Sequence, residues 1–111
     1  MIVPTASIRL VITTAGSRDE ANRIARALVD ARLAACVNLL PEVSSVYRWQ
    51  GAVESADEVL LLIKTTAENL EPLESALRRL HSYQLPEFLV LRPEAATQAY
   101  ADWLASSVQR S

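Results

Sequence analysis

The 111-residue chain is poor in glycine, cysteine and histidine, with two, one and one of these residues. A single cysteine, Cys36, excludes an internal disulfide bond and a metal site built from several cysteines of one chain. The sequence contains no Gly-x-Ser-x-Gly elbow, P-loop or Cys-x-x-Cys motif, and no second histidine that could orient a nucleophile. These absences predict that the protein is not an enzyme.

The chain also has no large excess of one charge and no long apolar run. A formal net charge of -2, with 22% charged residues, provides no basic face for nucleic acid and no polybasic patch for a membrane surface. The longest aliphatic run, residues 59–63, is far too short for a membrane span, and the N-terminus lacks the pattern of a signal peptide. We therefore expect a cytoplasmic protein, folded as one domain over residues 1–111, with no nucleic-acid or membrane partner.

The first part of the chain predicts a strand followed by a helix. Apolar and other residues alternate over residues 7–14, which is the periodicity of a strand. Ser17 and Glu20 then have the spacing of a capping box, in which each side chain accepts a hydrogen bond from the backbone N–H of the other residue. An apolar stripe follows at helical spacing, so we expect the helix to end near Leu33.

The next segment is typical of a long β-hairpin. It is rich in β-branched and aromatic residues and has no helical stripe. We place its arms at residues 35–49 and 53–66, with the turn at Gln50-Gly51. Because proline cannot donate a hydrogen bond to a neighbouring strand, Pro41 predicts a bulge or bend in the first arm.

The remaining pattern predicts helix, strand and helix. Thr65 and Glu68 offer a second capping-box spacing ahead of a leucine stripe over residues 70–80. A short apolar strand is expected over residues 88–91 and a C-terminal helix over residues 97–108.

This order predicts an α+β, ferredoxin-like βαββαβ fold with a long β-hairpin and a C-terminal helix. Val59, Leu61 and Ile63 should face the helices, whereas Leu60 and Leu62 should point to the other side of the sheet. The second face is then apolar too. Monomers rarely expose so large an apolar surface, so we expect another subunit to cover it.

The only histidine, His81, lies at the junction between the second helix and the last strand of the sheet. Tyr83, Pro86 and Glu87 follow it closely, and such junctions often carry function. The same histidine could instead simply end the helix, where a polar side chain meets the carbonyl dipoles. For a metal, His81 and Glu87 are the candidate ligands.

Several segments together carry a family resemblance. They are residues 31–38, 45–49, 58–66, the His81 segment and residues 100–104. In this order and spacing they resemble the CutA divalent-cation-tolerance family over about residues 8–108. The resemblance implies a tight homotrimer, related in architecture to the PII signalling proteins. It also implies a role in the response to metal ions such as copper.

The sequence departs from the family at positions that matter for metal binding. Family members credited with a copper site are thought to have a histidine and a cysteine where this chain has Leu80 and Thr13. Ser82 replaces a usual proline, and Gln84 replaces a frequent glutamate. The resemblance thus implies no certain cofactor, and Cu(II) or another divalent cation would bind only weakly.

The alternative hypothesis is a PII-like trimeric sensor that signals to a partner protein. Its ligand would be a small molecule in a cleft between subunits, with Cys36, Trp49, Lys64 and Tyr83 as candidate lining residues. A structural interpretation of the same residues is also open. Cys36 is then a small core residue, and the aromatic residues are ordinary interface anchors.

Overall fold

The computed structural model describes residues 1–109, so Arg110 and Ser111 of the predicted domain lie outside the described part. Its elements, in chain order, are β1 (Ile2–Pro4), β2 (Ile8–Ala15), α1 (Arg18–Asp30), β3 (Cys36–Trp49), β4 (Ala52–Thr66), the 3-10 turn η1 (Ala67–Asn69), α2 (Leu70–Leu80), β5 (Leu89–Leu91), β6 (Ala95–Thr97) and α3 (Gln98–Ser106). No helix within residues 1–109 combines the length and apolar character needed to cross a bilayer.

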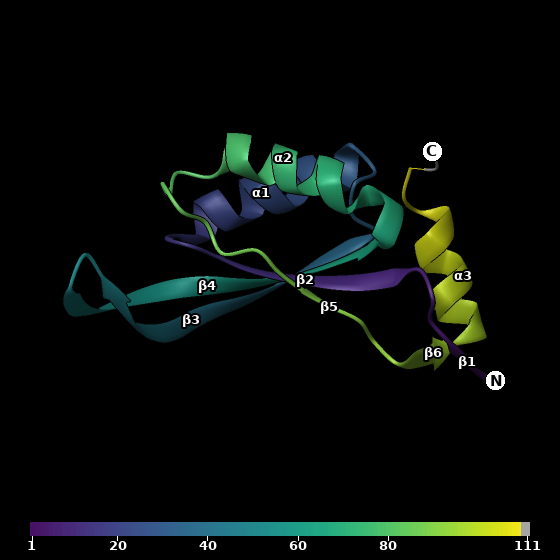
Figure 1. Ribbon diagram of the computed structural model, residues 1–111. Coiled ribbons are helices and arrows are strands. Elements are labelled where there is room, and N and C mark those ends of the chain that lie inside the picture. Colours follow the sequence, from purple (N-terminus) through teal and green to yellow (C-terminus); the bar gives the residue numbers. More distant parts are fainter. Residues whose placement is uncertain (110–111) are drawn as a thin grey trace.

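The main sheet has the strand order β3-β4-β2-β5, and all of its neighbouring strands are antiparallel. Helices α1 and α2 lie side by side on one face of this sheet (Figure 1). The ferredoxin-like fold is therefore confirmed. The core lies between the helices and the sheet, and its largest fully buried apolar side chains are Val11, Ile24, Leu28, Leu61, Ile63, Leu73 and Leu77.

The predicted division of β4 between two faces is also confirmed. Val59, Leu61 and Ile63 are buried under the helices, whereas Leu60 and Leu62 are only partly buried on the other side. The strand register places further apolar residues beside these two. We call this set the open sheet face, and it consists of Leu10, Ile12, Leu40, Leu60, Leu62, Leu89 and Leu91.

The hairpin formed by β3 and β4 projects beyond the helix layer, and the molecule measures 47 × 25 × 22 Å (Figure 1). The bulge expected at Pro41 is present, because the register shifts between Leu40 and Val43. Glu42, within this bulge, has a φ of 62°. The bulge bends the first arm and increases its twist.

The helix starts only partly follow the capping-box predictions. At α1 the Ser17 hydroxyl accepts from the Glu20 N–H at 3.2 Å, as expected. The Glu20 carboxylate, however, accepts from the Ser82 N–H instead of completing the box. The second capping box is wrong, because Thr65 is still part of β4 and its hydroxyl donates to the Leu33 carbonyl oxygen at 2.7 Å.

One small sheet was not predicted. Strands β1 and β6 pair next to α3, and the Gln98 N–H donates to the Met1 carbonyl oxygen at 2.9 Å. The Thr5 hydroxyl also donates to the Pro93 carbonyl oxygen. The Ala-Ala-Thr sequence of β6 has no alternating pattern, so only its pairing with the N-terminus defines it as a strand.

The hairpin turn yields a prediction about stability. Its two central residues, Gln50 and Gly51, have φ of 50° and 84°, which a type I′ turn requires. Gln50→Asn should therefore raise the free energy of unfolding slightly, because asparagine tolerates this conformation better. Gly51→Ala should lower it by about 1 kcal/mol, although a Cβ at this position would meet no atom within 4 Å. Urea denaturation of both variants checks the two signs. A free energy of unfolding that Gly51→Ala leaves unchanged would contradict the assigned turn.

Candidate functional site

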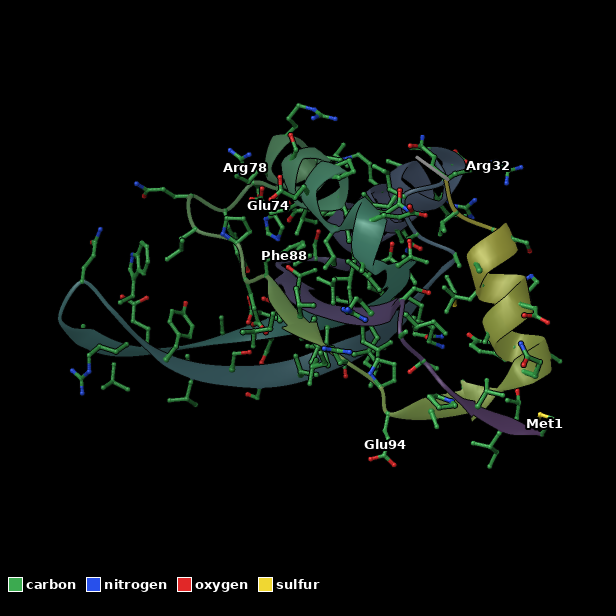
Figure 2. All side chains as sticks on the ribbon, turned by 45° about the vertical axis from the view of Figure 1, so that its right-hand side comes forward. Met1, Arg32, Glu74, Arg78, Phe88 and Glu94 are labelled. Atoms are coloured by element: carbon green, nitrogen blue, oxygen red, sulfur yellow. The ribbon has the colours of Figure 1, made fainter. Side chains whose placement is uncertain are left out.

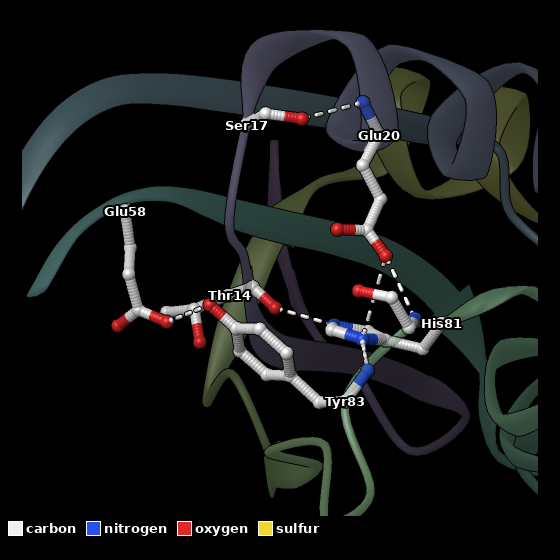
Figure 3. Close-up of polar contacts among 7 residues, drawn as sticks. Thr14, Ser17, Glu20, Glu58, His81 and Tyr83 are labelled. Carbon is white, nitrogen blue, oxygen red and sulfur yellow. Dashed lines mark hydrogen bonds and ion pairs between the residues drawn. The ribbon is translucent and has the colours of Figure 1, made fainter.

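The imidazole of His81 is the centre of a buried polar network (Figure 3). His81 is the C-terminal cap residue of α2, and its side chain is fully buried. Its Nδ1 accepts from the Tyr83 N–H at 3.0 Å, and its Nε2 lies 2.6 Å from the Thr14 carbonyl oxygen. Because that carbonyl can only accept, the geometry specifies a ring protonated at Nε2. The histidine thus ties the junction to strand β2.

Glu20 holds the same junction from the side of α1. Its Oε2 accepts from the Ser82 N–H at 2.8 Å and lies 3.7 Å from Nδ1 of His81. Burial alone would raise the pKa of the Glu20 carboxyl. The hydrogen bonds from Ser82 and Gly16, together with the electrostatic contribution of the adjacent His81 ring, outweigh burial and lower that pKa below its usual value.

Tyr83 extends the network to the sheet. Its hydroxyl donates to Oε2 of Glu58 at 2.7 Å. Burial, this hydrogen bond and the nearby negative charges raise the pKa of Tyr83 well above its usual value. The ring fits against Gly16, where an added Cβ would lie 3.2 Å from the Tyr83 hydroxyl oxygen. Glu87 lies in the same electrostatic environment, because burial and the charge of Glu58 both raise its pKa.

Of the two predicted metal ligands, His81 is the centre of this network, and Glu87 is linked to it only through the charge of Glu58. Both ring nitrogens of His81 already have hydrogen-bond partners. Within residues 1–109, no three His, Cys, Asp or Glu side chains are grouped closely enough to hold a metal ion. A metal at His81 would therefore have to displace a buried hydrogen bond.

The structure brings two of the four predicted cleft residues together within one chain and leaves the other two apart. Cys36 and Lys64 are direct partners in the β3-β4 register, and the Lys64 Nζ lies 5.7 Å from the centre of the Tyr100 ring. Tyr83 contacts Glu58, which precedes Lys64 by six residues, or about 20 Å along a strand. Trp49 is at the far end of the hairpin. Only contact between subunits could bring Trp49 and Tyr83 close to the pair of Cys36 and Lys64.

Sequence reasoning missed Glu20 and Glu58 as members of the network. Glu20 was identified only as a capping residue, although it is buried and bonds a segment 62 positions away. Glu58 is also buried, at the start of the apolar part of β4. The sequence offers one signal for Glu58, which stands directly ahead of an aliphatic run. A carboxylate at the start of a buried strand requires a polar partner.

The fold and the network define a class: a ferredoxin-like α+β domain with an uncovered apolar sheet face and a rigid, histidine-anchored junction. The family described as CutA1 divalent ion tolerance protein matches residues 9–107. The chain therefore belongs to the CutA1 family.

Individual relatives agree with this assignment. The divalent-cation tolerance protein CutA of Thermus thermophilus is 44% identical over 95 residues, covering 86% of this chain and 92% of that protein. The chloroplastic protein CutA of Arabidopsis thaliana is 38% identical over 100 residues, which cover 90% of this chain but 55% of that protein. A structure of CutA from Synechococcus elongatus superimposes with a TM-score of 0.94 at 46% identity, covering 98% and 96% of the two chains.

Glu20 and Glu87 have pKa shifts of opposite sign, so their removal should change the free energy of unfolding in opposite directions. Because the pKa of Glu20 is lower in the folded than in the unfolded chain, its contribution to stability is complete above the unfolded value of about 4.3. That contribution is lost as the pH falls through the folded value. Glu20→Gln should therefore lower the free energy of unfolding at pH 7, and the difference from wild type should shrink in acid. Urea denaturation between pH 3 and 7, about the range in which carboxyl groups titrate, measures this.

Glu87→Gln is the matched control with the opposite sign. The pKa of Glu87 is raised, so its ionised form is disfavoured in the folded chain, and the substitution should stabilise the protein at pH 7. A pH-independent effect of Glu20→Gln, or the same sign for both variants, would contradict the network as described.

Proposed function

We propose that the protein contributes to divalent-cation tolerance as a cytoplasmic homotrimer, with ions such as copper among those to which it responds. Membership of the CutA1 family supports the tolerance role. The open sheet face is the structural observation that supports the proposal of a trimer. The cellular compartment stays a prediction, since the Arabidopsis relative is named as chloroplastic.

The open sheet face is too apolar for a free surface. On β5, the strand at its edge, Leu89 and Leu91 are 58% and 45% exposed. Leu62, at the centre, lies opposite Ile12 in the β2-β4 register, so the apolar side chains are contiguous. Burial of such a surface stabilises an assembly by roughly 25 cal/mol per Å2. Because α1 and α2 lie on the other side of the sheet, a partner subunit can reach this face directly (Figure 1).

Direct metal binding has a small part in this proposal. A cation at His81 would have to displace the Tyr83 N–H or the Thr14 carbonyl oxygen from a buried ring. Leaving either group unsatisfied costs about 1–3 kcal/mol. Glu87 could add one oxygen, which is too few ligands for a tight site. We infer that metal binding is weak and that the role in tolerance is indirect.

The alternative, a small ligand in a cleft between subunits, stays a prediction. It requires the trimer to bring Trp49 of one subunit close to Lys64 or Tyr83 of another. A thermal-shift screen of small anions on the intact assembly tests it, because a ligand that binds only the folded state raises the melting temperature. The family comparisons favour the tolerance role over this alternative.

The proposed trimer generates a prediction about molecular mass and growth. Light scattering on a sizing column should give a mass of about 37 kDa, three times the 12.2 kDa of the chain. Leu62→Asp should abolish this assembly, because it places an unpaired charge in the buried interface. In cells that lack their own CutA protein, the wild-type chain should restore growth on copper and Leu62→Asp should not.

Val29→Asp is the matched control for this experiment. Val29 is 40% exposed on α1, away from the open sheet face, so the variant should remain trimeric and restore growth. A monomeric wild type at micromolar concentration would refute the assembly. A trimer that fails to restore growth would refute the tolerance role alone.

Copper binding should be weak and should depend on His81. Calorimetric titration with Cu(II) is expected to give a dissociation constant on the order of micromolar or weaker, because few ligands converge. His81→Ala should remove this binding and also lower the free energy of unfolding by about 2 kcal/mol, since two buried hydrogen bonds are lost. Nanomolar binding that survives His81→Ala would be inconsistent with this account.

A further inference from the structure

A hollow of about 310 Å³ lies between the end of α2 and the segment that follows His81. Its lining residues are Ser75, Arg78, Arg79, Tyr83, Gln84 and Pro86. A second hollow of about 500 Å³ adjoins it along α2, shares Ser75 and Arg78, and reaches Phe88. Figure 2 shows Glu74 and Arg78 on α2, close to Phe88. Together the two hollows form one groove on the helix side of the molecule, away from the open sheet face.

The smaller hollow carries two positive charges and no negative one among its lining residues, whereas Glu71 and Glu74 line the larger hollow. Arg78 uses its Nε for an ion pair with Glu74 at 2.7 Å, which leaves its terminal nitrogens available. Arg79 makes one long hydrogen bond, 3.4 Å to the Ser75 hydroxyl. Within residues 1–109, no carboxylate lies within ion-pair distance of Arg79. The hollow therefore has donors that the chain itself does not satisfy.

The opposite wall is held rigid by the network around His81. The Tyr83 N–H is bound to His81, the Ser82 N–H to Glu20, and the Tyr83 hydroxyl to Glu58. Gln84 and Pro86 follow directly on this fixed backbone. A preorganised wall lowers the entropy that a ligand loses on binding. The hollow is at the lower end of the usual size range for small-molecule sites, which begins at about 300 Å³.

We propose that this hollow binds the phosphate group of a small phosphate monoester. Two planar guanidinium groups match the geometry of phosphate oxygens and can each donate two parallel hydrogen bonds. The Ser75 hydroxyl and the Gln84 amide supply further donors, and the Tyr83 ring and Pro86 offer an apolar surface to the organic part. All these residues lie on the helix side of the molecule, away from the open sheet face, so this proposal and the proposed trimer are tested by different variants.

The test uses the intact protein with glycerol 3-phosphate and inorganic phosphate as probes, in parallel titrations followed by NMR of backbone and arginine side-chain N–H groups. The expected result is saturable shifts confined to Ser75, Arg78, Arg79 and Gln84, with tighter binding of the monoester than of inorganic phosphate. Arg79→Gln should weaken binding about tenfold or more, as expected for loss of a charge-assisted hydrogen bond. Equal affinity for both probes would identify a site for the free ion and overturn the monoester proposal.

Arg26→Gln is the matched control, because Arg26 is an exposed arginine on the other helix, α1. It should bind both probes as the wild type does. Equal weakening by both variants, or shifts spread over all exposed arginines, would show unspecific attraction and overturn the site. Unchanged binding by Arg79→Gln with an unchanged melting temperature would overturn it as well.

Discussion

The buried imidazole of His81 is the interaction on which the junction between α2 and the last strand of the sheet depends. Its Nε2 is satisfied by the Thr14 carbonyl oxygen on β2. Its Nδ1 is satisfied by the Tyr83 N–H, two residues further along the chain. An unsatisfied polar group in this position would cost about 1–3 kcal/mol, so the ring and both partners hold one another in place. From this fixed point Tyr83 reaches Glu58 on β4, and Ser82 reaches Glu20 on α1. The junction that His81 anchors thus links both helices to two strands.

The two faces of the molecule differ in character. On one side the helices cover the core, and the fixed junction forms a wall of the groove that contains Arg78 and Arg79. On the other side lies the open sheet face, which packs against another subunit in the proposed trimer. A rigid junction keeps β5 in register with β2, and β5 contributes Leu89 and Leu91 to that face. The network on the helix side therefore helps to shape the surface through which we propose that subunits associate.

Most of the fold could be predicted from the sequence, because periodicity of two and of 3.6 residues is a local property of the chain. The hairpin, its bulge near Pro41 and the two faces of β4 all follow from such local patterns. The β1-β6 pair could not be predicted, since each strand is three residues long and only the pairing defines it. The site was found only in part. His81, Tyr83 and Glu87 were identified as unusual residues at a junction, but Glu20 lies 62 positions before Ser82, and only the folded chain shows where its carboxylate points.

The state of the His81 ring tests the anchored junction most directly, and NMR of the imidazole nitrogens at neutral pH measures it in the intact protein. The expected result is one neutral species with the proton on Nε2, a slowly exchanging ring N–H, and a hydrogen-bond coupling between Nδ1 and the Tyr83 N–H. A ring protonated at Nδ1, or two tautomers in rapid exchange with solvent, would contradict it. The junction would then not be anchored through Thr14, and the rigid wall beside Arg79 would lose its physical basis.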